Sequence, residues 1–384
     1  MRLQHGTLGR ERPRAQGERV VRAEVPDSDR LKFRWLELPA VTGELPGTGG
    51  VIRERTDDFE VEEIPAYEPS GRGTHVYAWV EKQGRTTRDL VTALVRAGAD
   101  ERAVGVAGLK DKHALTRQWL SLPERFEAAL GALEAMDGVR VLTVTRHHNK
   151  LAIGHLRANR FRIRVRQAKP AAAARAEAIV AQLERLGVPN YYGPQRFGRY
   201  GTNAVDGLKV ARGEKVPGGH RLERFFVSAL QSQLFNRLLR SRIERGLFQS
   251  VVRGDWAKKH STGGLFLVED PERESLRARA LEISSALPLY GKKVKLSAAD
   301  AGGLEQAALD DLKLRWLDFR SRKGSRRISR VLLEEAEVAG LEDGFELSFR
   351  LPKGSYATNV LREVMKTSVD TPEADWEATQ ATEE

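Results

Sequence analysis

Residues 160–166 read RFRIRVR, an alternation of apolar and cationic side chains that is typical of a β-strand. Successive side chains of a strand point to opposite faces, so the three apolar residues are expected to face a core and the arginines the other side. The row consists of Arg160, Arg162, Arg164 and Arg166. Like charges on one face repel one another unless anions compensate them. Those anions are either an external polyanion or acidic side chains of the protein itself, and the strand alone leaves both interpretations open.

Similar patterns on both sides of this stretch predict an α+β fold. Apolar residues at period two predict strands at 75–80, 140–145 and 346–351. Residues 58–64 (DFEVEEI) alternate apolar and acidic side chains, as expected of an edge strand with a solvated acidic side. Amphipathic or alanine-rich segments predict helices at 86–96 and 171–186. Strands interleaved with helices indicate a mixed, largely antiparallel sheet.

The length of 384 residues and a shift in composition predict two domains. A more helical block at 216–328, with helices expected at 225–245, 276–287 and 307–323, interrupts the strand-rich sequence. Strand character returns at 346–351, and a helix is expected to run from Ser355 through Met365. We therefore expect a first domain of residues 51–215 and 329–370 with residues 216–328 inserted into it. Residues 1–50 are expected to be a flexible basic extension, and residues 371–384 an acidic tail.

The composition restricts the kinds of chemistry that are available. The chain has 40% apolar and 30% charged residues and no apolar run near the roughly 18 residues of a membrane span, so we expect a cytoplasmic globular protein. It contains no cysteine, which excludes disulfides, thiol catalysis and cysteine-ligated metals. Its eight histidines lack metal-ligand spacing, and no P-loop motif is present, so no metal or cofactor is expected. A net charge of +11 favours a polyanionic partner such as nucleic acid.

Residues 106–119 (VAGLKDKHALTRQW) place one acid, Asp111, between Lys110 and Lys112 at an expected turn. One interpretation is a solvated loop whose charges happen to alternate. The other is a working carboxylate that neighbouring cations keep ionised by lowering its pKa.

Residues 188–203 (VPNYYGPQRFGRYGTN) interleave aromatic rings with arginines, amides and glycines. Rings that stack on bases and amides that read base edges suit unpaired nucleotides. The alternative is a glycine-rich loop that folds its own aromatic side chains back onto the core.

Together these segments resemble the tRNA pseudouridine synthase D family. The resemblance rests first on AGLKDKHALTRQ (107–118) and NYYGPQRFG (190–198), and continues in GHLRANRF (154–161), SALQSQLFNRLL (228–239) and LPKGSYATNVLRE (351–363). It spans residues 51–368. Two departures from the family's pattern are Tyr192, where the family has phenylalanine, and Ala158, where it has a second glycine.

The resemblance implies a pseudouridine-synthase-like catalytic domain with an inserted family-specific domain. It implies isomerisation of uridine 13 of tRNA to pseudouridine, with Asp111 as the catalytic group and the target base flipped onto the ring of Tyr192. Whether Asp111 attacks C1′, attacks C6 or removes a proton from C2′ stays open. The resemblance also implies a basic residue near the catalytic acid, and this position falls on Arg53. We expect substrate contacts from Arg53, Asn190, Lys110 and Lys112. RNA contacts are expected from Arg146, Arg160, Arg162, Arg164 and Arg196.

The expected partner is tRNA, without a membrane or an obligate protein partner, and the expected state is a monomer. Two other classes of function remain. A non-catalytic RNA-binding protein would keep the basic strand and the aromatic loop but give no reason for Asp111. A metal-dependent nuclease would need acids that converge on Mg²⁺, whereas the acids of 57–63 lie on a strand whose side chains alternate in direction.

Overall fold

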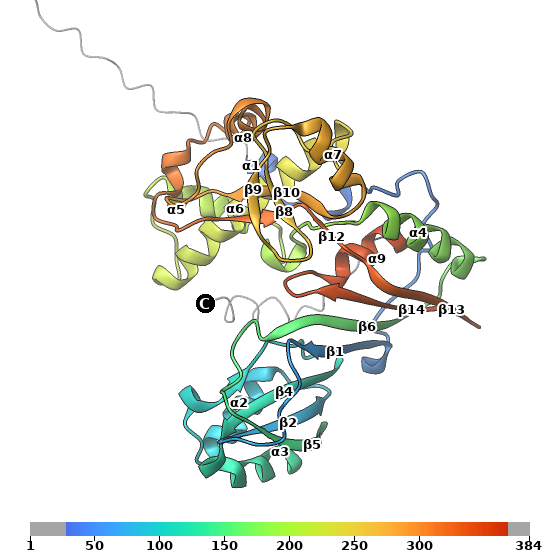
Figure 1. Ribbon diagram of the computed structural model, residues 1–384, viewed down its shortest axis with the longest axis vertical. Helices are drawn as coiled ribbons and strands as arrows, with labels where there is room; N and C mark the ends of the chain where they lie inside the picture. The colour runs from blue at the N-terminus through green and yellow to red at the C-terminus, as the bar shows by residue number, and fades with distance from the viewer. Residues whose placement is uncertain (1–27, 368–384) are drawn as a thin grey trace, which may run out of the picture.

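The computed structural model describes residues 28–367, and Figure 1 shows them as a large sheet with a second, more helical lobe above it. The sheet has eight strands, and only the pairing of β1 with β4 is parallel. Its main path is β13 (Glu334–Leu341), β14 (Gly344–Pro352), β6 (Leu156–Arg166), β1 (Phe59–Pro65), β4 (Leu115–Pro123), β2 (His75–Lys82) and β5 (Val139–His147), and β3 (Gly105–Val106) pairs with β4. The predicted α+β class is confirmed.

Strand β1 lies between β6 and β4, so the prediction of an edge strand was wrong. Its acids are not a solvated face: Glu60 stands opposite Arg162 of β6, and Glu62 opposite Arg160. Arg162 and Arg117 both pair with Glu60, which is buried. The acidic and the cationic alternations therefore neutralise each other across two adjacent strands, a cross-strand pairing that stabilises a sheet.

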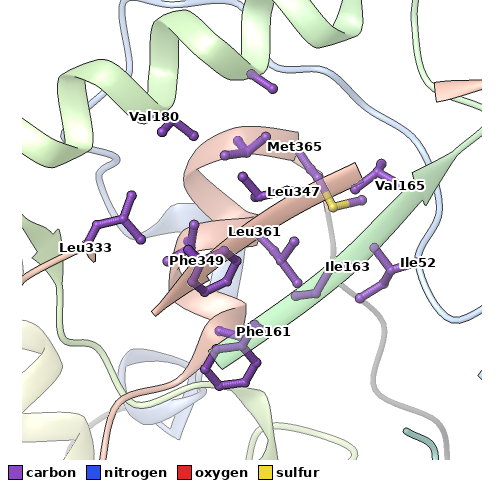
Figure 2. Close-up of a cluster of buried hydrophobic side chains, with 14 of the residues drawn as sticks. Ile52, Phe161, Ile163, Val165, Val180, Leu333, Leu347, Phe349, Leu361 and Met365 are labelled. Carbon is purple, nitrogen blue, oxygen red and sulfur yellow. The ribbon is translucent and has the colours of Figure 1, made fainter. Parts of the chain in front are cut away.

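The other face of β6 and β14 carries the main apolar core, which Figure 2 shows. The three apolar residues of the RFRIRVR strand point into it as predicted, together with Phe349 of β14. Helices α4 (Ala172–Leu186) and α9 (Ala357–Met365) cover this face. A second core, under α2 (Thr87–Arg96) and α3 (Gly131–Glu134), fills the end of the sheet formed by β2, β4 and β5. The Thr86 hydroxyl accepts from the Asp89 N–H and so begins α2 as a capping box.

The second lobe packs a four-stranded sheet against helices. Its strands are β11 (Ser325–Ile328), β10 (Ile283–Leu289), β8 (Trp256–Lys259) and β9 (Leu265–Leu267), in that order. Its helices are α5 (Asn203–Ala211), α6 (Gly219–Glu244), α7 (Pro271–Arg279) and α8 (Ala299–Asp310). Helix α5 packs against α6 through Leu208 and Leu230, so residues before 216 already belong to the second lobe. The domain boundaries drawn from composition remain a prediction.

Two helix predictions in this lobe were wrong. The segment 276–287 ends its helix at Arg279, turns at Leu281 in the left-handed region (φ 60°), and continues as the fully buried strand β10. A strand buried on both faces has no alternation, so periodicity cannot distinguish it from a buried helix. The segment 307–323 leaves the helix at Asp310, and Lys313 also has a left-handed backbone (φ 50°).

The chain passes between the lobes at a two-stranded pairing of β7 (Val188–Pro189) with β12 (Arg330–Val331). Arg330 is fully buried there and donates to the carbonyls of Leu186, Ala278 and Ile283. It thereby connects the end of α4 with α7 and β10. Six short 3-10 helices complete the fold: Trp35–Glu37, Thr56–Asp58, Glu101–Ala103, Glu124–Leu130, Pro194–Arg196 and Trp316–Phe319.

The described part of the predicted flexible extension is packed, which corrects the expectation for residues 28–50. After α1 (Ser28–Leu31), the side chains of Phe33 and Trp35 are buried, and the Phe33 ring stacks on that of Phe197 at 4.0 Å. The Glu363 carboxylate on α9 accepts from the Thr42 N–H and hydroxyl. The apolar spacing at 31–38 was the signal that the arginine-rich composition concealed. Residues 1–27 and the predicted tail at 371–384 lie outside the described residues.

None of the described helices is long and apolar enough to cross a membrane.

Phe33→Ala should lower the free energy of unfolding by about 3–5 kcal/mol, because it removes a buried ring and leaves a cavity. Chemical denaturation measures this. Leu36→Ala is the matched control, since Leu36 is exposed three residues away and should cost no more than about 0.5 kcal/mol. Equal, small effects of both changes would contradict the packing of this segment.

Candidate active site

A cavity of about 320 Å³ opens beside the end of the large sheet. It is lined by residues from five separated segments of the chain: 53–61, 108–111, 156–161, 193–196 and 353–358. Both stretches that the sequence singled out reach it, the turn with Asp111 and the loop with Arg196. The fold therefore brings the two main motifs to one cavity.

Asp111 stands on the turn between β3 and β4, and its side chain is half exposed. Its Oδ2 lies 3.6 Å from Nη2 of Arg53. This arginine is the substrate-binding residue that the sequence placed near the acid, and the structure puts the two together. A working carboxylate on this turn requires an accessible acid beside a fixed cation, and the Asp111–Arg53 pair has this arrangement.

Arg53 is fixed by an uncommon backbone and by its own packing. Its φ is 60°, in the left-handed region that residues other than glycine rarely adopt. Its side chain is buried, with the guanidinium carbon 4.4 Å from the centre of the Phe59 ring, a cation–π contact. Such backbone conformations persist where the surroundings hold them, and they cluster at functional sites.

Lys82 holds the backbone of the Asp111 turn, a role that the sequence did not reveal. Its fully buried ammonium donates to the carbonyl oxygens of Asp111 and Arg85, both at 2.7 Å. Burial lowers its pKa to about 8, although the nearby Asp111 carboxylate raises it. The available signal was a lysine at an inward position of the alternating strand HVYAWVEK (75–82).

The two lysines that flank Asp111 in sequence lie in different environments. Lys110 turns inward and donates to the buried carboxylate of Glu63 at 2.8 Å. Lys112 is exposed. Lys110 lines the cavity while its charge is paired with Glu63, and its expected contact with substrate stays a prediction. Gly108 keeps this ion pair close to the cavity, since an added Cβ would lie 3.3 Å from Nζ of Lys110.

Tyr192, expected to stack on the target base, is buried and is not among the residues that line the cavity. Its ring packs edge-on against Phe235, and the Arg327 guanidinium carbon lies 4.3 Å from the ring centre. Arg327 also donates to Oδ1 of Asn190 at 2.5 Å. Tyr356, whose ring centre is 6.3 Å from that of Tyr192, lines the cavity instead. The sequence missed Arg327 and Tyr356, which come from a distant part of the chain.

Burial raises the pKa of the Tyr192 hydroxyl, while Arg327 opposes the shift. The Arg327 guanidinium is thus a cationic neighbour of the ring face, in a cation–π contact.

Most of the arginines predicted to bind RNA are paired with carboxylates of the protein. Arg160 pairs with Glu335 at 3.1 Å, Arg164 with Glu346 at 2.9 Å, and Arg146 with Glu124 and Glu127. The β6 row is thus the internally compensated face that the sequence left as an alternative, and a role for it in RNA binding stays a prediction. Arg196 differs, because it lines the cavity.

Within residues 28–367, no three side chains of histidine, aspartate or glutamate converge in a way that could hold a metal ion. The acids of β1 instead face arginines or Lys110.

Lys82→Met should remove a pH dependence of stability. Between pH 8 and the ordinary lysine pKa of 10.5, the unfolded chain binds a proton that the folded protein does not, so the wild type becomes more stable as the pH rises. From about pH 7.5 to about pH 9.5, its free energy of unfolding should rise by about 2 kcal/mol more than that of Lys82→Met. Denaturation at several pH values measures this difference. Lys112→Met, at an exposed lysine, should follow the wild type, and parallel curves for all three proteins would refute the buried charge.

Comparison with known proteins finds relatives that match most of this chain. The family model described as tRNA pseudouridine synthase D matches residues 36–215 and 213–364. A tRNA pseudouridine synthase D of Thermus thermophilus is 51% identical over 337 residues, which are 88% of this chain and 94% of the relative. One of Anaeromyxobacter sp. is 47% identical over 350 residues, covering 88% and 99%.

A solved structure from Methanosarcina mazei, titled as a tRNA pseudouridine synthase D, superposes with a TM-score of 0.71. The superposition covers 90% of this chain and 99% of the other, at 23% sequence identity. This likeness concerns the fold.

Proposed function

The chain belongs to the tRNA pseudouridine synthase D family. We therefore propose that it is an enzyme that isomerises uridine 13 of tRNA to pseudouridine, with Asp111 as the catalytic group. The relatives' names support the class of reaction, since each is called a tRNA pseudouridine synthase. A cytoplasmic location and a monomeric state stay predictions.

The observation that carries the proposal is the Asp111 carboxylate at the cavity wall. It occupies the acid position of the motif AGLKDKHALTRQ and is open to solvent, with Arg53 on one side and the Lys82 ammonium behind its backbone. An ionised, accessible and fixed carboxylate is what nucleophilic or basic catalysis requires.

The reaction breaks the bond between N1 of uracil and C1′ of ribose and forms a bond between C5 and C1′. The proton on C5 is lost, and N1 gains one, so the product is an isomer of the substrate and the stoichiometry needs no external oxidant or group donor. Asp111 serves by attacking C1′ or C6, or by taking a proton from C2′. Each of these roles needs the negative charge.

The target base must leave its stack to enter the cavity, at a cost of a few kcal/mol. Arg196 and Lys353 at the cavity wall supply positive charge for the neighbouring phosphates. Stacking on an aromatic ring offsets part of the cost of flipping. The motif assigns this ring to Tyr192, and Arg327 has to withdraw from the ring face before a base takes its place.

Asp111→Asn should lower the single-turnover rate of pseudouridine formation by several orders of magnitude while tRNA affinity stays near normal. The amide has nearly the same shape but lacks the charge. Mass spectrometry detects pseudouridine, and titration gives the affinity on the same preparation.

The matched control for this change is Asp57→Asn. Asp57 is also half exposed and also 3.6 Å from an arginine, Arg164, but it does not line the cavity. It should retain full turnover. Near-normal turnover by Asp111→Asn would refute the assignment. Binding of tRNA without any product from the wild type would instead leave a non-catalytic RNA-binding protein.

Tyr192→Phe should be nearly silent in turnover, because the ring that contacts Phe235 and Arg327 is kept. Tyr192→Ala should lose about 1–3 kcal/mol of base stacking. Single-turnover kinetics at subsaturating tRNA measures both variants. Equal damage from the two changes would mean that the hydroxyl, rather than the ring, is what the reaction uses.

A further inference from the structure

Resting on the proposed function, we propose that Asn159 determines the specificity for uracil by accepting a hydrogen bond from N3–H of the flipped base. Asn159 belongs to the GHLRANRF stretch (154–161), and the motif assigned it no role.

Asn159 lies where the apolar face of β6 meets the cavity. Alternate residues of a strand share a face, so Asn159 lies on the same face of β6 as Phe161, Ile163 and Val165. Its side chain therefore leaves the sheet on the core side rather than on the arginine side. It lines the cavity together with Phe161 and Asp111. The position therefore places an amide next to Phe161 in the same cavity that Asp111 lines.

Asn159 has an acceptor that the protein does not use. Its Oδ1 is buried, and no donor among the described residues bonds to it. The residue opposite on β1 is Glu63, whose Oε1 is also buried and without a donor in the described part of the chain, while its Oε2 accepts from Lys110. Two acceptors cannot bond each other, and a buried acceptor left unpaired is energetically unfavourable. This corner of the cavity therefore favours a ligand that brings an N–H group.

Uracil brings such a group. Its N3–H is an imide donor flanked by two carbonyl oxygens, so one asparagine amide can accept from N3–H and donate to a carbonyl in the same plane, as amides do on base edges. Cytosine has a lone pair at N3 and brings no N–H there, which leaves Oδ1 unpaired. A site built to pair a substrate N–H rejects an analogue without it, because its own buried polar group is then left unsatisfied.

The test couples a change in the protein to a change in the base. The variant is Asn159→Leu, which keeps the size of the side chain and removes the acceptor. The substrates are two tRNAs with uridine or 3-methyluridine at the target position, and the measurement is the single-turnover rate at subsaturating enzyme. In the wild type, 3-methylation should slow the reaction by about 10-fold or more, the equivalent of one lost hydrogen bond. In Asn159→Leu, the uridine tRNA should be slowed by a similar factor, and 3-methylation should add little.

Asn359→Leu is the matched control. Asn359 also has a buried Oδ1 without a donor in the described structure, but it donates to the Tyr191 carbonyl and does not line the cavity. Its penalty for 3-methylation should equal that of the wild type, and thermal unfolding confirms that both variants fold. An unchanged penalty in Asn159→Leu would overturn the inference and leave Asn159 a structural residue. Absence of pseudouridine from the wild-type reaction would instead overturn the proposed function.

Discussion

The position of β1 between β6 and β4 is the constraint on which the rest of the first lobe depends. In this register, Glu60 and Glu62 meet the arginines of β6, while Phe59 and Val61 face the core side. A slip of one residue would send every side chain of the strand to the opposite face. It would bury carboxylates against leucines and leave the arginine row uncompensated. Charge pairing on one face and apolar packing on the other thus specify the same alignment, and the cavity forms at the end of the aligned face.

The segment that follows α1 also stabilises the cavity wall, although the two are far apart in the sequence. Arg362 of α9 donates to the Trp35 carbonyl, and Glu363 binds the backbone of Val41 and Thr42. The residues just before and at the start of α9, 355–358, line the cavity wall. Because Phe33 in turn stacks on Phe197 within the aromatic loop 188–203, one short segment ties α9 to that loop. This explains why residues 28–50 are packed although they follow directly on an arginine-rich stretch of sequence.

Local sequence predicted the elements better than it predicted their partners. The strand at 160–166, the helix at 86–96 and the turn with Asp111 follow from alternation, capping and glycine placement, and all are present. Proximity of Asp111 to Arg53 followed from motif resemblance. The inward turn of Lys110, the contact of Lys82 with the Asp111 carbonyl and the coverage of Tyr192 by Arg327 did not. Each depends on a residue from a distant segment, and alternation within one strand carries no information about which strand will lie beside it.

The order of strands has a consequence for synthesis on the ribosome. Strand β6 needs β14 on one side and β1 on the other, and β14 leaves the exit tunnel only after the whole second lobe. Domains generally fold as units while the chain emerges, at about 5–20 residues per second. The second lobe can therefore fold first, while β6 waits for about 10–40 seconds with one edge unpaired. An unpaired edge is a template for aggregation. Arg160 and Arg164 still lack Glu335 and Glu346 during that interval, so their charge repels the same strand of a neighbouring chain.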